Sequence, residues 1–202
     1  LYVAGNISWW VCLLANAFFA SLTHELEHDL IHSMYFRRQR IPHNLMMALV
    51  WLARPSTINP WVRRHLHLNH HKVSGSETDL EERAITNGEP WGLTRLIMVG
   101  DNMASALIRL FRAPNWAQGK KTLLRTMAVF APLALLHWAA WYLFLGIHAA
   151  DAISSLLGAP IEWSASSQSL IHGLNIAVVV LVGPNVLRTF CLHFISSNMH
   201  YY

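Results

Sequence analysis

The chain has 202 residues, of which 53% are apolar and only 13% are charged, and its formal net charge is +4. The charged share is about half of that in soluble globular domains, which argues against a soluble enzyme and for a chain that faces lipid. The cysteines, Cys12 and Cys191, lie in or beside apolar stretches and indicate core residues rather than metal ligands or a disulfide framework. No nucleotide-binding fingerprint occurs, and no nucleic-acid partner is expected.

Several apolar stretches predict membrane helices. Three are long enough to span a bilayer, since about 1.5 Å per residue gives each roughly 30 Å: 2–22, 127–149 and 170–190. A shorter run, 45–53, would reach only about 14 Å and is expected to lie at the interface or under a loop. The sequence therefore predicts an all-α integral membrane protein, with about three transmembrane helices in one domain over residues 1–202.

Basic residues predict the orientation of these helices. All but one of the 15 Lys and Arg residues fall between Arg37 and Arg125, whereas the connection 150–169 has none. Cytoplasmic flanks of membrane helices collect Lys and Arg, so residues 23–126 are expected to form a cytoplasmic helical cap. In a bacterial cell the membrane would be the inner one. Residues 93–111 mix apolar positions with arginines and predict an amphipathic helix on the same membrane face.

The first histidine segment, HELEHDLIH at 24–32, has histidines at strict four-residue spacing. Residues four apart are neighbours on a helix, so His24, His28 and His32 would share one face. Two interpretations are open. His24 with His28 completes the HExxH pattern of zinc proteases, whereas His28 with His32 makes a different metal-binding pair. The protease interpretation leaves the second histidine segment unexplained.

That second segment, RRHLHLNHH at 63–71, falls within the same predicted cap. On a helix His67 shares a face with both His70 and His71, which diverge from each other by about 100°, so one segment could serve two metal ions. Clustered imidazoles without thiolates suit iron, zinc, copper or nickel. The spacing alone therefore predicts a metal site and leaves the metal open.

Together these segments resemble the histidine boxes of membrane fatty acid desaturases. HDLIHSMYFRRQRIPHN at 28–44 is similar to the first box, and RRHLHLNHH is similar to the second, an H-x-x-H-H preceded by arginine. SSNMHYY at 196–202 is similar to a segment near the cytoplasmic end of the family's last helix. The resemblance covers most of the chain, from the first helix to Tyr202.

The resemblance implies a non-haem site for two irons, built almost wholly from histidines. Carried over residue by residue, it implies these ligands: His28, His32, His67, His70, His71 and His200, with His24 and His193 as second choices. Glu25 and Asp29, inside the first box, are the main candidates to orient ligating imidazoles, with Asp79, Glu81 and Glu82 behind them. Related alkane monooxygenases have a first box resembling H-E-L-x-H, so the choice between His24 and His32 stays open.

The implied activity is oxygen-dependent desaturation of a fatty acyl chain, either lipid- or thioester-linked, with O2 as co-substrate. A ferredoxin, rubredoxin or cytochrome b5-like protein would supply electrons, docking on a basic face that includes Arg37, Arg38, Arg63 and Arg64. A membrane hydroxylase or alkane monooxygenase of the same superfamily is the alternative, and a membrane zinc metalloprotease using HELEH comes third. The third histidine box does not occur, so we interpret the sequence as truncated at both ends.

Overall fold

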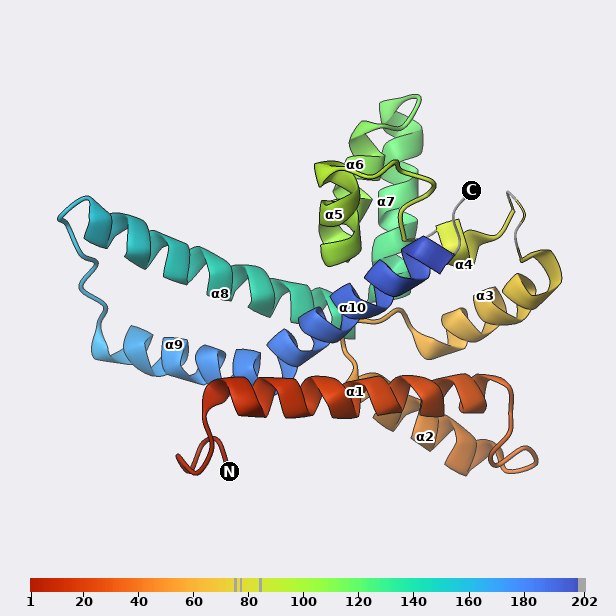
Figure 1. Ribbon diagram of the computed structural model, residues 1–202, viewed down its shortest axis with the longest axis horizontal. Helices are drawn as coiled ribbons and strands as arrows, with labels where there is room; N and C mark the ends of the chain where they lie inside the picture. Colours follow the sequence, from red (N-terminus) through yellow and green to blue (C-terminus); the bar gives the residue numbers. More distant parts are fainter. Residues whose placement is uncertain (75, 77, 84, 200–202) are drawn as a thin grey trace.

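The structure is a computed structural model that describes residues 1–74, 76, 78–83 and 85–199. Over these residues the chain is helical and contains no strand, which confirms the predicted all-α class (Figure 1). The elements in chain order are α1 Trp9–Ile31, α2 Arg40–Ala53, α3 Pro60–Val73, α4 Leu80–Arg83, α5 Leu93–Gly100, α6 Asn102–Phe111, α7 Trp116–Phe130, α8 Leu133–Leu156, α9 Ala165–Ala177, the π-helical segment η1 Val178–Val182, and α10 Gly183–Met199.

The first predicted membrane span, 2–22, is wrong at its start. Residues before Trp9 form turns, with Gly5 at φ +74°, and α1 then runs to Ile31, well past the apolar stretch. The apolar part of α1 within 9–22 would cover only roughly 21 Å. Within the described part of the chain, two helices are long and apolar enough to cross a membrane, namely Leu133–Leu156 and the continuous Ala165–Ser197.

Two further predicted helices have different bounds in the structure. The stretch 127–149 is divided at Pro132, because α7 ends at Phe130 and α8 starts afresh at Leu133. The amphipathic helix predicted over 93–111 is divided at Asp101, whose backbone is extended and whose carboxylate caps α6 by accepting from the N–H groups of Met103 and Ala104.

Helix α1 lies toward one side of the molecule, at the bottom of Figure 1, and it packs against α10, α2 and η1. Its C-terminal turns pack on α2 through a core of Leu30, Ile31, Met47 and Val50. Farther back, the Asn16 amide donates to the carbonyl of Val180 at 2.8 Å, inside η1. In a π-helical segment the backbone hydrogen bonds depart from the α-helical pattern, and the Asn16 contact joins this segment to α1.

Helix α3 begins with residues that favour a helix start. Asn59 is the N-cap, its side chain accepts from the N–H groups of Trp61 and Val62, and Pro60 occupies the first turn. The backbone N–H of Asn59 also donates to the carbonyl of Val129 near the end of α7, at 2.9 Å. These contacts tie the start of α3 to the end of α7, and α3 also packs against α1, which carries the first histidine segment.

Candidate metal centre

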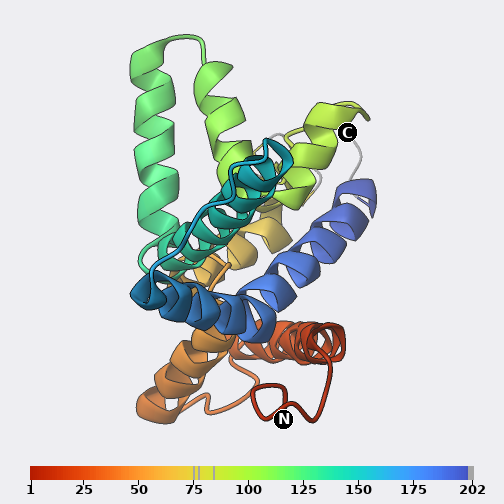
Figure 2. The same cartoon turned by 90° about the vertical axis from the view of Figure 1, so that its left-hand side faces the viewer.

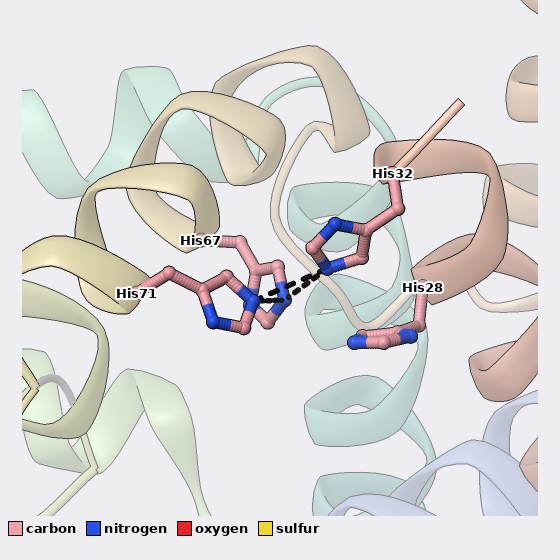
Figure 3. Close-up of side chains that lie close together, drawn as sticks. All are labelled: His28, His32, His67 and His71. Carbon is pink, nitrogen blue, oxygen red and sulfur yellow. Dashed lines mark hydrogen bonds between the residues drawn. The ribbon is translucent and has the colours of Figure 1, made fainter. Parts of the chain in front are cut away.

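Four histidines from two helices converge on one point. His28 and His32 come from the end of α1, and His67 and His71 come from α3 (Figure 3). One ring nitrogen of each lies within 4.8 Å of those of the other three. The Nε2 atoms of His32, His67 and His71 are closer still, at 3.1 to 3.2 Å from one another. The i, i+4 spacing in each segment thus places two imidazoles on each facing surface.

The protonation of His67 leaves a lone pair pointing into this cluster. Its Nδ1 lies 3.0 Å from a carboxylate oxygen of Glu81, which can only accept, so Nδ1 carries the proton. In the neutral ring Nε2 is then an unprotonated nitrogen, and it faces His32 and His71. Nitrogens bound to one ion at about 2.1 Å lie roughly 3 Å apart, which matches the spacing of these three atoms.

Glu81 is held as a carboxylate by its neighbours. Burial would raise its pKa, but the hydrogen bond from His67 and the positive charge of Arg63 outweigh burial and lower the pKa below its ordinary value. A negative charge on this group strengthens the electron donation of the imidazole that it contacts. Glu81 therefore both fixes the tautomer of His67 and raises its basicity.

A second imidazole of this segment, that of His70, is oriented in the same way. His70 Nδ1 lies 2.7 Å from an oxygen of Asp79, which is fully buried. The second oxygen of Asp79 accepts from the N–H of Glu81 at 3.1 Å, so the turn before α4 brings both acids back onto α3. Both were the weaker candidates in the sequence, because acidic residues after a helix are usually solvated.

The acids inside the first segment are placed differently from expectation. Asp29 comes within 3.8 Å of His28 Nδ1, which is longer than a hydrogen bond. Glu25 is exposed, and among the described residues no hydrogen bond joins its carboxylate to an imidazole. The buried acid of this segment is Glu27, whose side chain is 1% exposed.

Glu27 is the centre of a buried ionic network. It contacts the guanidinium of Arg54, and Arg63 Nη1 donates to its Oε2 at 2.7 Å. Arg54 Nη1 in turn lies 2.7 Å from His24 Nδ1. Arginine offers only donors, so this nitrogen of His24 must accept. Burial and the positive charges of Arg63 and Arg54 lower the pKa of His24 to about 2, so the ring stays neutral.

This network separates the two halves of HELEHDLIH. His24 faces arginines, whose positive charges oppose a cation at that position, whereas His28 and His32 join the histidines of α3. An HExxH zinc site would require His24 and His28 to hold the same ion. The observed geometry therefore gives no support to the protease interpretation.

A model of the fatty acid desaturase family matches residues 7–202. The chain belongs to the fatty acid desaturase family. Neither a search of curated proteins nor a search of solved structures gave a match. Membership makes the protein an oxidoreductase of a membrane-bound family that acts on fatty acyl chains, generally with a di-iron centre, O2 and an electron-transfer partner.

The residues present fit the iron expected of a desaturase. The cluster offers imidazoles without thiolates, a donor set that suits iron. Burial and the neighbouring His28 and His67 lower the pKa of His32, which favours the neutral form that a metal ligand needs. His70 is not one of the four clustered histidines, but its ring stacks on that of His67 with centroids 5.8 Å apart.

Of the other candidate ligands, the structure describes His193 and not His200. His193 is inside α10 and outside the four-histidine cluster. His200 falls outside the described residues. The sequence analysis missed Glu27 and Arg54. Glu27 precedes the buried Leu30 and Ile31 by three and four residues, and this spacing was an available signal that its side chain faces inward. A single arginine after a helix, such as Arg54, carried no such signal.

Proposed function

We propose that this protein is a membrane-bound, iron-dependent desaturase that introduces a double bond into a lipid- or thioester-linked fatty acyl chain. The observation that carries the proposal is the convergence of both histidine boxes, with three Nε2 atoms at 3.1 to 3.2 Å. Family membership supports the reaction class, and the donor set supports the metal.

In this proposal, four histidines hold iron directly: His28, His32, His67 and His71. His70, and His200 or His193 beyond it, would serve a second ion. When bound, the iron supplies the oxygen-dependent oxidation that removes hydrogen from an unactivated methylene. The chain positions the ligands: Glu81 and Asp79 keep the Nδ1 protons of their histidines in place.

The buried ionic network would keep α1 and α3 in register, because Glu27 on α1 is bonded to Arg63 on α3. A shift between these helices would separate the two histidine pairs. The network therefore has a positioning role in the proposed site, and His24 belongs to it rather than to the metal ligands.

We further propose that the histidine boxes lie on the cytoplasmic side, within residues 23–126. In this arrangement α8 and the continuous α9–α10 helix cross the membrane, and the connection 150–169 faces outward. A basic face would receive the acidic electron carrier. This basic face has fewer exposed arginines than the sequence predicts, because Arg63 packs against the buried Glu27 and Arg64 is hydrogen-bonded to Ser33. Arg37, Arg38 and Arg40 remain exposed.

Iron content and product analysis test the proposal together. The complete protein, purified in detergent, is expected to hold about two irons per chain, and cells that express it should accumulate unsaturated acyl chains. His71→Ala should abolish product and lower iron, whereas His148→Ala, outside the cluster, should leave both unchanged. Hydroxylated products would favour the hydroxylase alternative. One zinc per chain that depends on His24 and not on His67 would refute the proposal in favour of a metalloprotease.

A further inference from the structure

A stripe of positive charge runs along one face of α7. Lys120, Lys121 and Arg125 are exposed there, together with Leu124. Together with Ala117 and Ala128, these four side chains line a shallow, mainly apolar hollow of about 500 Å³. The cationic stripe, as we call these six residues, therefore combines an apolar floor with a cationic rim.

The packing of α7 on α6 directs the cationic stripe outward. At Gly119 an added Cβ would lie 2.6 Å from the carbonyl oxygen of Leu110 and 3.0 Å from Ala113 Cβ, so α7 approaches the end of α6 there without a side chain between them. Successive residues of a helix turn by about 100°. With this rotation, the residues of the cationic stripe are centred on the side of α7 opposite Gly119, and this side faces away from α6.

The orientation of the α6–α7 hairpin relative to α8 and α9 determines how the cationic stripe would face a membrane. It runs across the direction of α8 and α9 (Figure 1), and the view along those two helices shows it lying to one side of them (Figure 2). If α8 and α9–α10 cross the membrane, as proposed above, the hairpin lies along the membrane surface. Exposed apolar side chains accompany the stripe: Phe111 is 75% exposed, Trp116 63% and Leu124 59%.

We propose that the cationic stripe binds the headgroup of an anionic phospholipid in the cytoplasmic leaflet. Lys120, Lys121 and Arg125 would surround the negatively charged phosphate, while the apolar floor accepts the start of the acyl chains. The apolar floor and the exposed Phe111 and Trp116 favour a lipid over a soluble anion, which would leave these apolar surfaces in water.

Lipid binding at the cationic stripe would also affect the helix that carries His67 and His71. The carbonyl of Val129, at the end of α7, accepts from the N–H of Asn59, which caps the helix that carries His67 and His71. A lipid on the cationic stripe would therefore help to hold α3 at a constant depth relative to the membrane surface. This inference rests on the proposed membrane orientation but not on the proposed reaction.

Native mass spectrometry of the full chain in detergent tests the inference. Phosphatidylglycerol, which is anionic, and phosphatidylcholine, which has no net charge, are titrated separately with identical acyl chains, so that only the headgroup differs. Each basic residue near an anionic surface changes affinity about fivefold. The variant with Lys120→Gln, Lys121→Gln and Arg125→Gln should therefore bind phosphatidylglycerol at least about tenfold more weakly, with phosphatidylcholine unchanged. The single substitutions should each give part of the loss.

A matched control removes the same charge elsewhere, through Arg37→Gln, Arg38→Gln and Arg40→Gln, and should keep the affinity of the wild type. Equal loss in both variants would overturn the proposal, because net charge alone would then explain it. Unchanged lipid binding in the α7 variant, with weaker reduction by an acidic electron carrier, would assign the stripe to a protein partner instead. The readout is lipid affinity, so a failure of the desaturase proposal would be seen separately in iron content and products.

Discussion

His67 shows how much of the site depends on single contacts. One ring nitrogen faces Glu81, and the other faces His32 and His71 at 3.1 to 3.2 Å. If the carboxylate were absent, either tautomer would be available to the imidazole, and one of them would point a proton at the metal position. The carboxylate therefore determines which His67 nitrogen is free for a metal.

Replacement of Glu81 by glutamine should weaken metal binding. The amide can still accept from His67 Nδ1, but it lacks the negative charge that raises the basicity of the ring, so we expect iron affinity to fall by about 10- to 100-fold. Competition with a chelator measures this affinity. Glu25→Gln is the control, since Glu25 is exposed, and it should have little effect. A larger loss in the control would show that the acid inside HELEH orients the ligands after all.

Among the elements, α1 has two parts with different environments. Its first turns are apolar and largely exposed, whereas its last turns carry Glu27, His28, Leu30 and Ile31 into contacts with other helices. The ionic network at Glu27 joins α1 to Arg63 on α3 and to Arg54 after α2. These three elements bring together the segments on which the candidate ligands lie.

Removal of the charge of Glu27 should therefore destabilise the whole site. Glu27→Gln leaves Arg54 buried without its anion, and unpaired buried charges of this kind cost about 3 to 5 kcal/mol. Thermal unfolding of the detergent-purified protein should show a clearly lower midpoint. In the control, Glu89→Gln, the partner Arg112 is 54% exposed, so the change should cost about 0 to 1 kcal/mol. Equal midpoints for the two variants would contradict the structural role of the network.

The junction of α6 and α7 makes a second prediction at this scale. Gly119→Ala places a methyl group 2.6 Å from a backbone oxygen, and overpacking of this kind costs about 1 to 3 kcal/mol. Gly146→Ala on α8 meets nothing within 4 Å and should be neutral or slightly stabilising. Limited proteolysis of the hairpin compares them, and faster cleavage only in Gly119→Ala is expected. Cleavage at the rate of the wild type would show that α6 and α7 can separate without cost.

At the scale of the whole molecule, the candidate metal centre and the loop between α8 and α9 lie toward opposite ends of the long axis (Figure 1). The loop side carries Asp151 and Glu162 and no basic residue, whereas exposed arginines cluster at the end of α1. A membrane across α8 and α9–α10 therefore separates a basic face from an acidic one.

Cysteine labelling in intact cells tests this orientation. In a background with Cys12 and Cys191 replaced by alanine, Ser166→Cys should react with a thiol reagent that cannot cross the membrane. Arg38→Cys should react only after the inner membrane is permeabilised. Both positions are exposed, so accessibility alone does not distinguish them. The reverse pattern would place the histidine boxes outside the cytoplasm.

Much of the fold followed from local patterns. Apolar runs predicted helices 127–149 and 170–190 close to α8 and the α9–α10 helix, but Pro132 moved the start of α8 and Asp101 divided the helix expected at 93–111. Both changes have a local cause that a hydropathy pattern does not weigh.

The sequence by itself determined that histidines four residues apart would share a helix face, because helical periodicity is a local property. It did not decide between His24 and His32, since both lie four residues from His28. Each step of four residues turns the side-chain direction around the helix axis by about 40°, so the two histidines face different neighbours. Only the tertiary structure decided that choice. It places α3 beside His28 and His32, and it places Arg54 and Arg63 beside His24. Long-range packing of α1, α3 and the segment after α2 therefore brings His28 and His32, rather than His24, to the histidines of α3.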